Sequence, residues 1–410
     1  MKKTDRLLII NKEFTWFLLS RVLMTCGIKM TPVLLGWHLY ELTGSKLSLG
    51  ILGLSEVVPA IIFALPAGVS VDTSDKRKLI IRCLIGYVIV MVVFGWITSD
   101  AATLLLGVPI IEYSIYGLVA ITGYIRAFYS PANSAIIAQI VHTDHLVKAA
   151  TTNSMSWLAA AISGPLIAGL LIGLLNVSAA FYIVIVLITA SIVVFSLISS
   201  KEITYIKGKI KTWESVKEGL NFVYQQKALL GAMGLDMFAV LFGGAIALLP
   251  VFAKDVLFVG PQGFGILMSA TYLGNFVALL YFARWPLQHK QGYKLLVSVA
   301  CFGICIIVFA LSRSFVLSFL ALMVSGLFDG VSMIVRGTIF QLFVPDSMRG
   351  RVSSVNSIFI NSSNELGQFE SGVAASLMGT VPSVVFGGTM TLLISAIAYF
   401  KVPALKKLEY

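Results

Sequence analysis

Seven charged side chains stand inside apolar stretches that are long enough to cross a lipid bilayer. A charge at that depth costs at least a few kcal/mol, so it normally faces a water-filled path or an opposite charge. Burial and a neighbouring charge also change how readily a carboxylate takes up a proton. Such a set is typical of a pathway for ions or polar solutes. The seven are Arg21, Lys29, Glu56, Asp236, Asp329, Arg336 and Glu365.

The composition indicates an integral membrane protein. Hydrophobic residues make up 58% of the 410-residue chain and charged residues only 12%, whereas soluble proteins carry about 25% charged residues. Apolar stretches recur along the whole length, and each reaches the roughly 20 residues that a helix needs to span about 30 Å of hydrocarbon. We therefore expect an all-α membrane protein with twelve transmembrane helices. The expected spans are 14–40, 46–71, 79–99, 104–140, 150–175, 177–199, 229–255, 263–285, 293–312, 315–343, 352–379 and 382–402.

Lys and Arg residues are distributed unequally between the two sides of these spans. Apart from Lys46, Lys254 and Arg313, and from four cations inside the membrane, all of them fall on one side. By the positive-inside rule, both termini are cytoplasmic. The run 14–40 is too long for a signal-peptide core and is expected to be a retained helix. Because the net charge of +11 has this distribution, nucleic-acid binding is not expected. The four membrane cations are Arg21, Lys29, Arg126 and Arg336.

A polar segment divides the chain into two halves of six spans. We expect a helical bundle over 1–199, a cytoplasmic linker over 200–228 and a second bundle over 229–410. Within the linker, apolar and polar side chains separate onto opposite faces of a helix. This separation predicts an amphipathic helix on the cytoplasmic membrane surface. Its apolar face carries Trp213, Val216, Leu220 and Val223.

Short matches relate the two halves at offsets of 215, 202 and 203 residues. Parallel six-helix repeats of this kind form substrate sites between the halves near the bilayer midplane, and they work by rocking one half against the other. The repeats therefore favour a secondary transporter. The matches are Gly50-Ile51-Leu52 with Gly265-Ile266-Leu267, Arg21 with Asp236, Gln139 and Asp144 with Gln341 and Asp346, and Asn153, Gly164 and Gly169 with Asn356, Gly367 and Gly372.

The turn after the second span carries a motif, Gly68-Val-Ser-Val-Asp72-Thr-Ser-Asp75-Lys76-Arg77-Lys78. It resembles the signature G-x-x-x-D-x-x-G-R-[RK] of the major facilitator superfamily. The glycine permits close approach of a neighbouring helix, the Asp caps a helix or pairs with a base, and the cations hold the turn inside. The resemblance implies a conformational latch at Gly68, Asp72, Lys76 and Arg77 rather than a substrate site.

A glycine–proline element lies in the fifth span, Ser163-Gly164-Pro165-Leu166-Ile167-Ala168-Gly169. It is similar to the G-P-x-x-[GA]-G element of exporters in the same superfamily. Gly164, Pro165 and Gly169 are expected to bend this helix and to let backbones pack closely. The resemblance favours export over import.

Three further stretches resemble the branch of the superfamily that contains enterobactin exporters and macrolide efflux proteins. The resemblance implies a major facilitator fold of two pseudo-symmetric six-helix bundles. Spans 1, 4, 7 and 10 then line the central cavity, and spans 2, 5, 8 and 11 meet between the halves. This branch often has an acidic residue after the glycine of span 1, but here Gly27 precedes Ile28 and Lys29, so no ion-coupling residue is carried over. The stretches are Trp37-x-x-Tyr40-x-Leu42-Thr43-Gly44-Ser45-x-x-Ser48-Leu49-Gly50, Ser215-Val-Lys-Glu-Gly219-Leu-Asn-Phe222-Val223 and Pro345-Asp346-Ser-Met-Arg349-Gly350-Arg351-Val352-Ser353-Ser354-Val355-Asn356.

The depth of each buried charge follows from its distance to the span ends at about 1.5 Å per residue. Glu56, Asp329 and Glu365 lie near the middle, where desolvation most favours the neutral acid, and are the proton-coupling candidates. Asp329 ranks first because it lies on a cavity-lining helix. Arg21, Lys29, Asp236, Arg336 and Arg126 are the candidates for ion pairs or gates.

Each of these charges also has a purely structural interpretation. Asp329 and Arg336 are seven residues apart on one helix, so they share a face but are expected to lie too far apart to pair directly. Each is instead expected to pair across helices. Lys29 and Glu56 lie at similar depth on adjacent spans and can form a static ion pair. Arg126 can extend to the cytoplasmic interface.

Aromatic and polar side chains along the expected path are the candidates for substrate contact. Asn361 belongs to them because 361–372 is unusually polar for a span, so this face meets protein or water. Most aromatic residues in membrane helices, by contrast, only contribute to packing. The full set is Trp37, Tyr40, Trp157, Phe242, Tyr272 and Asn361.

The energy source is expected to be an ion gradient, because no G-x-x-x-x-G-K-[ST] loop for ATP is present. Neither a cofactor nor a metal is expected, since Cys301 and Cys305 lack further ligands and His142 and His145 are the only close histidine pair. The chain is thus expected to be no enzyme but a monomeric, proton-coupled antiporter in a bacterial cytoplasmic membrane. It would export a bulky amphipathic small molecule, either drug-like or a siderophore. The alternative is an importer or uniporter of a small metabolite.

Overall fold

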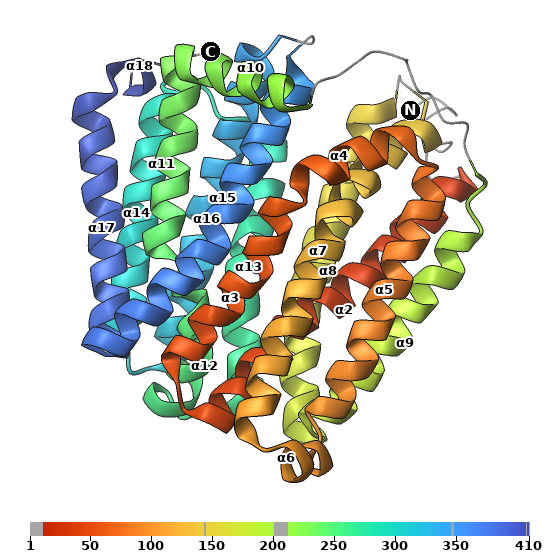
Figure 1. Cartoon of the computed structure of the whole chain (residues 1–410). Helices are drawn as coiled ribbons and strands as arrows, with labels where there is room; N and C mark the ends of the chain where they lie inside the picture. The colour runs from red at the N-terminus through yellow and green to blue at the C-terminus, as the bar shows by residue number, and fades with distance from the viewer. Residues whose placement is uncertain (1–10, 143–144, 201–211, 346–347, 407, 410) are drawn as a thin grey trace. The chain divides into compact units, whose positions relative to one another are not determined.

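The computed structural model describes residues 11–142, 145–200, 212–345, 348–406 and 408–409, and every regular element in these ranges is a helix (Figure 1). Ten helices of this described part are long and apolar enough to cross a membrane. The chain divides into two compact units. The first comprises Met1–Thr43 and Val58–Gly208, and the second comprises Gly44–Val57 and Lys209–Tyr410. The domain boundaries expected from the sequence stay predictions.

The first unit is organised around α2 (Lys12–Thr43), which packs against α8 (Leu146–Leu174) and α9 (Val177–Ser196). The hydroxyl oxygens of Ser20 and Ser191, 2.8 Å apart, join α2 to α9 inside the unit. On the other side of α9 lies α5 (Lys76–Ile97), which also packs against α7 (Val108–Ile140). The stacked rings of Phe94 and Phe181, with centroids 5.4 Å apart, fill the contact between α5 and α9.

Two expected spans of this region have different boundaries in the structure. The stretch 46–71 forms two helices, α3 (Lys46–Ile62) and α4 (Ala64–Thr73), separated by Phe63. Pro66 has no N–H to bond the carbonyl four residues earlier, so the helical ladder is interrupted there. The stretch 104–140 begins as a separate short helix, α6 (Asp100–Leu106), because Gly107 takes a φ of 78° that favours glycine.

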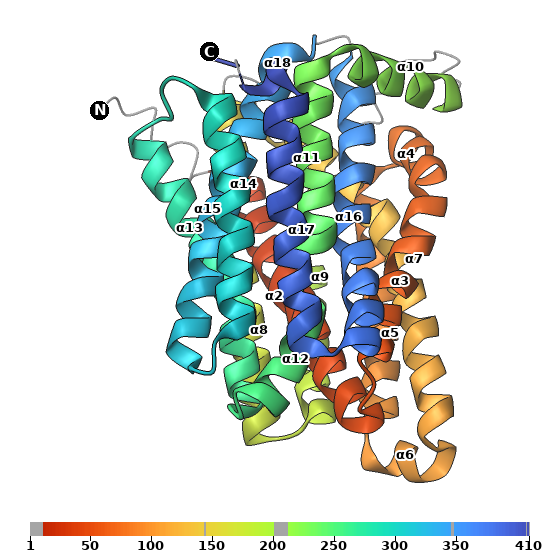
Figure 2. The same cartoon turned by 90° about the vertical axis from the view of Figure 1, so that its left-hand side faces the viewer.

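The second unit contains two layers of helices joined by close packing. The first pair, α13 (Gly260–Arg284) and α15 (Phe315–Phe343), pack together, and α15 also contacts α14 (Gln291–Leu311). On the other side, α17 (Thr380–Lys401) packs against α14 and α11 (Lys227–Gly243), and α11 packs against α16 (Arg349–Met378) (Figure 2). The first residues of α3 belong to this unit, where Gly50 lies against Gly372 of α16.

The expected span 229–255 is discontinuous. Its first part, α11, ends at Gly243, and the chain continues through η3 (Ala245–Leu248), α12 (Leu249–Val251) and η4 (Phe252–Val256). Gly244 has a non-helical ψ of 71°. Beyond the break the chain forms a 3₁₀ turn, a short α-helical turn and a π-helical turn in succession, so it has no continuous α-helical ladder. The last carbonyls of α11 therefore lie within the membrane segment rather than at its end.

The linker contains a helix, as predicted, α10 (Thr212–Gln225), which lies across the ends of α11 and α16 (Figure 2). Val223 is buried in the hydrophobic core of the second unit, whereas Leu220 is exposed. The expected position of this helix on the membrane surface stays a prediction. The side chains of Trp213 and Val216 lie outside the described residues. Glu218 forms an ion pair with Arg351 of α16. At the end of the described chain, α18 (Pro403–Lys406) packs against α11, α14 and α17.

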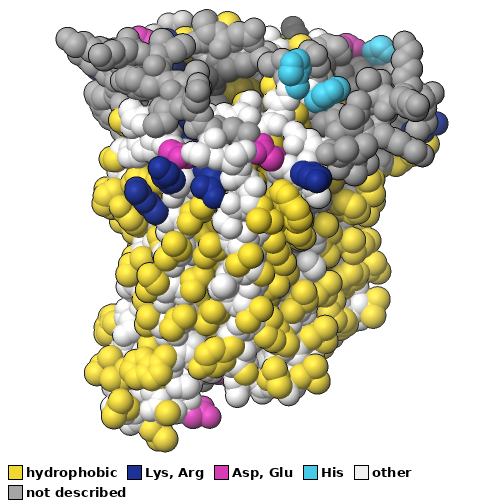
Figure 3. Space-filling view, turned by 90° about the vertical axis from the view of Figure 1, so that its right-hand side faces the viewer, with side chains coloured by type: hydrophobic (Ala, Val, Ile, Leu, Met, Phe, Trp, Pro, Cys, Tyr) yellow, Lys and Arg dark blue, Asp and Glu magenta, His cyan; other side chains and the backbone are white. Residues whose placement is uncertain are grey.

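The protein surface is suited to a lipid environment. Figure 3 shows one face covered mostly by hydrophobic side chains, with Lys and Arg gathered near one end. Large apolar residues of the outer helices are solvent-accessible, for example Ile89 on α5 (60% exposed) and Val186 on α9 (65% exposed). Exposed aliphatic side chains at this density are unfavourable in water but not in hydrocarbon.

Candidate functional site

The second unit contains a network of three charged side chains from two helices. Arg336 of α15 forms an ion pair with Asp236 of α11. The same guanidinium lies 3.9 Å from Asp329, measured from Nη2 to Oδ1. Its Nε donates to the carbonyl and hydroxyl oxygens of Ser332 at 3.3 and 3.2 Å. The Arg336 guanidinium therefore interacts with both carboxylates, Asp236 and Asp329.

The contact between Asp329 and Arg336 corrects an expectation from the sequence. Seven residues along a helix correspond to a rise of about 10 Å, which was taken to exclude direct contact. The side chain of a helical residue leans toward the N-terminus, however, and an arginine is long enough to reach back along its own helix. The expected pairing across helices is also present, with Asp236 as the partner of Arg336.

The three charges differ in their exposure. The Asp236 side chain is 8% exposed and that of Arg336 is 15% exposed, whereas the Asp329 side chain is 28% exposed. The buried pair is thus Asp236 with Arg336, and Asp329 is the more accessible carboxylate.

Asn275 of α13 is a further member of the network, which was not identified from the sequence. Its Nδ2 donates to Oδ2 of Asp329 at 3.3 Å. Its Oδ1 is buried and accepts no hydrogen bond from any described residue. Glycines set this contact, because a Cβ at Gly326 would lie 2.0 Å from the carbonyl oxygen of Thr271, and one at Gly330 would meet Asn275. The signal in the sequence was a lone amide in an apolar span.

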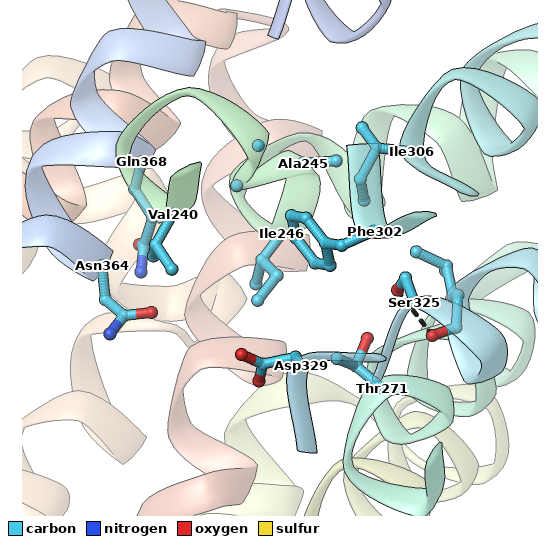
Figure 4. Close-up of a pocket in the computed structure, with 13 residues that line it drawn as sticks. Val240, Ala245, Ile246, Thr271, Phe302, Ile306, Ser325, Asp329, Asn364 and Gln368 are labelled. Carbon is cyan, nitrogen blue, oxygen red and sulfur yellow. Dashed lines mark hydrogen bonds between the residues drawn. The ribbon is translucent and has the colours of Figure 1, made fainter. Parts of the chain in front are cut away.

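A pocket in the same unit opens beside Asp329, at the point where α11 ends (Figure 4). Val240, Gly243 and Gly244 contribute the end of α11, and Ser325 and Asp329 contribute the face of α15. The remaining lining residues come from the neighbouring helices and from η3: Ala245, Ile246, Thr271, Phe302, Ile306, Leu322, Asn364 and Gln368.

None of the substrate-contact candidates whose side chains are described is among the lining residues. Asp329, which lines the pocket, belongs to the proton-coupling candidates. Phe242 and Tyr272 are close along the chain to lining residues. Phe242 packs edge-on against Phe386, with ring centroids 6.4 Å apart. The Asn361 side chain lies outside the described residues.

In the first unit, the charged candidates lie among apolar and aromatic side chains. The Lys29 ammonium lies over the ring of Trp157, 5.3 Å from its centroid. The Nε of Arg21 is buried and has no hydrogen-bond partner among the described residues. Trp37 and Tyr40 are buried. Arg126 also has a buried nitrogen, on a side chain that makes other interactions.

Two of the proton-coupling candidates lie outside the charged network described above. Glu365 is buried on α16. Glu56 belongs to the second unit and Lys29 to the first, so their pairing stays a prediction. Neither carboxylate lines the pocket beside Asp329.

The fifth-span element has the expected packing. A Cβ at Gly164 would lie 2.8 Å from the carbonyl oxygen of Cys26 and 2.8 Å from Cβ of Lys29, so α8 and α2 approach each other here through glycine. Pro165 and Gly169 are buried within α8. The glycine thus sets the position of Lys29 relative to Trp157, which lies on α8.

The turn at 68–78 is described only in part. A Cβ at Gly68 would meet no described atom within 4 Å, and the expected close approach of a neighbouring helix stays a prediction. The Asp72 side chain lies outside the described residues, and its role stays a prediction.

Asp75 and Arg77 hold the same turn to the end of α9. Asp75 is the N-cap of α5 and accepts hydrogen bonds from the amides of Arg77 and Lys78 at 3.0 and 3.3 Å. It also accepts from the Ser200 hydroxyl at 2.7 Å, and Arg77 donates to the carbonyl of Ser196 at 2.7 Å. Burial alone would raise the pKa of Asp75, but these hydrogen bonds hold it below its ordinary value.

Comparison with known proteins places this architecture in a family. The family model described as transmembrane secretion effector matches residues 9–410. The chain belongs to this family of major facilitator superfamily transporters. It is a multi-pass membrane transporter and not an enzyme, and transporters of this superfamily generally need no cofactor.

Two relatives align over nearly their full length. The uncharacterized MFS-type transporter YfmI of Bacillus subtilis (strain 168) is 22% identical over 419 residues, covering 97% of this chain and 98% of the relative. The staphyloferrin A transporter of Staphylococcus aureus (strain NCTC 8325 / PS 47) is 22% identical over 394 residues, covering 94% and 95%. The superfamily expected from the motifs is thereby confirmed.

Solved structures show the same fold. A POT family transporter in complex with 5-aminolevulinic acid has a TM-score of 0.75 at 12% identity, covering 96% of both chains. The nucleoside transporter NupG has a TM-score of 0.72 at 14% identity, covering 97% of this chain and all of the other. A bacterial homologue of the human lysosomal transporter Spinster has a TM-score of 0.68 at 15% identity, covering 96% and 98%.

Proposed function

We propose that this transporter is a proton-coupled exporter of a bulky amphipathic small molecule, working by alternating access in a bacterial cytoplasmic membrane. The proposal includes twelve spans, cytoplasmic termini, a monomeric state and the latch role of the 68–78 turn. The cargo is drug-like or a siderophore, and the name of the staphyloferrin A relative supports the second choice.

The observation that carries the proposal is the position of Asp329. It shares one guanidinium with Asp236, is the more exposed of the two carboxylates, and lines a pocket. Asp236 is the closer partner of Arg336, so we assign the exchangeable proton to the other carboxylate, Asp329. A cavity that meets water on each side in turn then delivers and releases the proton.

The release step follows from the same geometry. Asp329 and Arg336 lie on the same helix, so the moving partner is Asp236 of α11. Movement of α11 away from Arg336 would free the guanidinium to approach Asp329 and favour its charged form, and the return of α11 would favour its neutral form. A proton can therefore be exchanged once per transport cycle, in opposition to the cargo. Glu365 and Glu56 are the next candidates for the same role.

The test is flux in proteoliposomes with a pH gradient imposed in either direction, using Hoechst 33342 and staphyloferrin A as separate cargoes. We expect accumulation on the acidic side, driven by the gradient, for at least one of the two. Cargo flux down its own gradient that does not depend on pH would instead favour a uniporter. Accumulation on the alkaline side would favour an importer.

The variant Asp329→Asn tests whether Asp329 is the proton-coupling residue. Asn mimics the protonated carboxyl, so the variant should lose accumulation driven by the pH gradient, while a cargo without a basic nitrogen should still bind and exchange. Asp100→Asn, on the short helix α6, is the matched control and should accumulate cargo like the wild type. If Asp329→Asn still concentrates cargo with an unchanged pH dependence, Asp329 is structural and Glu365 or Glu56 takes its place.

A further inference from the structure

The pocket beside Asp329 has a distinct electrostatic character. Asp329 is the single charged side chain among its lining residues. Arg336 is not part of the lining, because its guanidinium is held by Asp236. Within the described residues, the pocket thus presents a carboxylate and no cationic side chain to a ligand.

The end of α11 adds to this negative character. This 17-residue helix ends at Gly243, and Val240, Gly243 and Gly244 line the pocket. The last carbonyls of a helix have no amide partner within the helix and carry a partial negative charge of about half an electron. Ends of broken membrane helices coordinate cations in other transporters for this reason.

The Asp329 carboxylate retains capacity to accept hydrogen bonds. Its Oδ1 is 3.9 Å from Arg336 and its Oδ2 is 3.3 Å from Asn275, whereas a strong charge-assisted hydrogen bond measures about 2.7–2.9 Å. A carboxylate has about four acceptor positions. Neither neighbour satisfies it fully, and its face toward the pocket is open to a donor (Figure 4).

The neutral lining residues suit the same type of ligand. The Ser325 hydroxyl donates its hydrogen to the carbonyl of Leu322 at 2.7 Å, so its oxygen can only accept from a ligand. Thr271 and Asp329 lie on one side of the space and the ring of Phe302 and Ile246 on the other (Figure 4). An aromatic face attracts a cation, and the aliphatic side chains accommodate its carbon atoms.

We propose that this pocket binds the protonated amine of an amphipathic substrate. The ammonium group donates to Asp329 and to the oxygen of Ser325, next to the terminal carbonyls of α11, while its carbon chain packs against Phe302 and Ile246. This inference rests on the proposed transport function and specifies its substrate class: compounds with a basic nitrogen, rather than ligands whose only charges are carboxylates.

The test uses three fluorescent probes that differ only in the end group. They are dansylcadaverine, with a primary ammonium group, its N-acetyl derivative, which is neutral, and dansyl-6-aminohexanoate, a carboxylate. Binding to the purified wild-type protein is measured by fluorescence in KCl. We expect the ammonium probe to bind at least about tenfold more tightly than the neutral probe, as expected for a hydrogen-bonded charge, and the carboxylate to bind most weakly.

Variants of the lining locate the binding site. Asp329→Asn should reduce the difference between the ammonium and neutral probes to about twofold or less, and Asp329→Glu should retain most of it. Asp100→Asn should bind all three probes like the wild type. Retention of the full preference in Asp329→Asn would show that the amine binds elsewhere and would overturn the inference.

The experiments distinguish an error in the proposed ligand class from an error in the proposed transport function. Displacement of the ammonium probe by millimolar Na⁺ but not by K⁺ would make this a sodium site and overturn the inference. Equal binding of the three probes, together with gradient-driven flux in proteoliposomes, would overturn the amine site and leave the export function intact. A clear ammonium preference without gradient-driven flux would support the amine site and refute the export function.

Discussion

At the scale of single residues, the site is defined by the ratio of charges. Asp236 and Asp329 share Arg336, so the network carries one more negative than positive charge when both carboxylates are ionised. An uncompensated buried charge is costly. In the proposed mechanism, uptake of one proton by Asp329 would remove this excess.

Asn275 can respond to both states of Asp329. Its Nδ2 donates to the carboxylate, while its Oδ1 is buried with no hydrogen bond from the described residues. When Asp329 is protonated, its new O–H needs an acceptor, and rotation of the amide would supply Oδ1. One side chain can therefore satisfy the charged and the neutral form, because an amide carries both donors and an acceptor.

Asn275→Leu is expected to change the pH dependence of transport. Leu has a similar size but no donor, so the charged form of Asp329 loses its hydrogen bond and the protonated form is favoured. The pH at which gradient-driven flux is half-maximal should rise by about one unit, the equivalent of one hydrogen bond to a charged group. The measurement is flux in proteoliposomes between pH 5 and 9.

The matched control is Asn153→Leu, because Asn153 is also buried in a span with an unpaired Oδ1 among the described residues but lies in the first unit. Its pH profile should coincide with that of the wild type. If the two variants shift the profile equally, or if Asn275→Leu leaves it unchanged, Asn275 has only a packing role.

At the scale of helices and turns, Asp75 shows how the 68–78 motif works within one unit. It caps α5, and with Arg77 it attaches the start of α5 to the end of α9. The motif thus has a local structural function, whatever Asp72 contributes to conformational exchange. A helix that starts without its cap leaves amide donors unsatisfied at the membrane surface.

Asp75→Ala should lower the free energy of unfolding by about 1 kcal/mol at neutral pH through loss of the N-cap. Because the folded-state pKa of Asp75 lies below its ordinary value of 3.8, the stabilisation is fully present above that value and is lost as the pH falls through the folded-state pKa. Denaturant unfolding of the purified protein at pH 7, 5 and 3 measures this. Asp75→Asn, which keeps a capping oxygen, should cost less at pH 7; an equal cost for both variants would contradict the capping role.

Most helices follow from the sequence, because runs of about 20 apolar residues have few alternatives to a span. The breaks within these helices were harder to predict from the sequence. Pro66, Pro250 and the Gly243-Gly244 pair were visible, but whether such residues bend, cap or break a helix depends on neighbouring helices. The pairing of Asp236 with an arginine was anticipated, whereas Asn275 was missed, because no pattern within a single span shows which helix faces Asp329.

At the scale of the whole molecule, two segments test the number of spans. The segment of α3 and α4 is broken at Phe63, and α16 is unusually polar, so neither belongs to the ten described helices that qualify as spans by length and hydropathy. In a transporter both features have a functional reason. A helix that faces a water-filled cavity or another helix need not be apolar on every side.

Reporter fusions at Lys3 and Glu409 should both give a cytoplasmic signal, and one in the 256–262 loop should report the outside. Opposite signals at the two ends would exclude an even number of spans. These fusions do not separate ten spans from twelve, however, because both numbers are even. The distinction requires positions that directly follow the two unusual segments.

Single cysteines at Ser74 and Thr380 make that distinction, in a background where the four native cysteines are replaced. If the segment of α3 and α4 crosses the bilayer, Ser74→Cys is cytoplasmic and resists an impermeant maleimide in intact cells until they are permeabilised. If α16 crosses, Thr380→Cys is labelled from outside. Ser99→Cys, in the turn before α6, is the control for outside labelling. Labelling of Ser74→Cys in intact cells would leave α3 and α4 on the outer side and reduce the number of spans, and with it the two-fold repeat on which alternating access between equal halves depends.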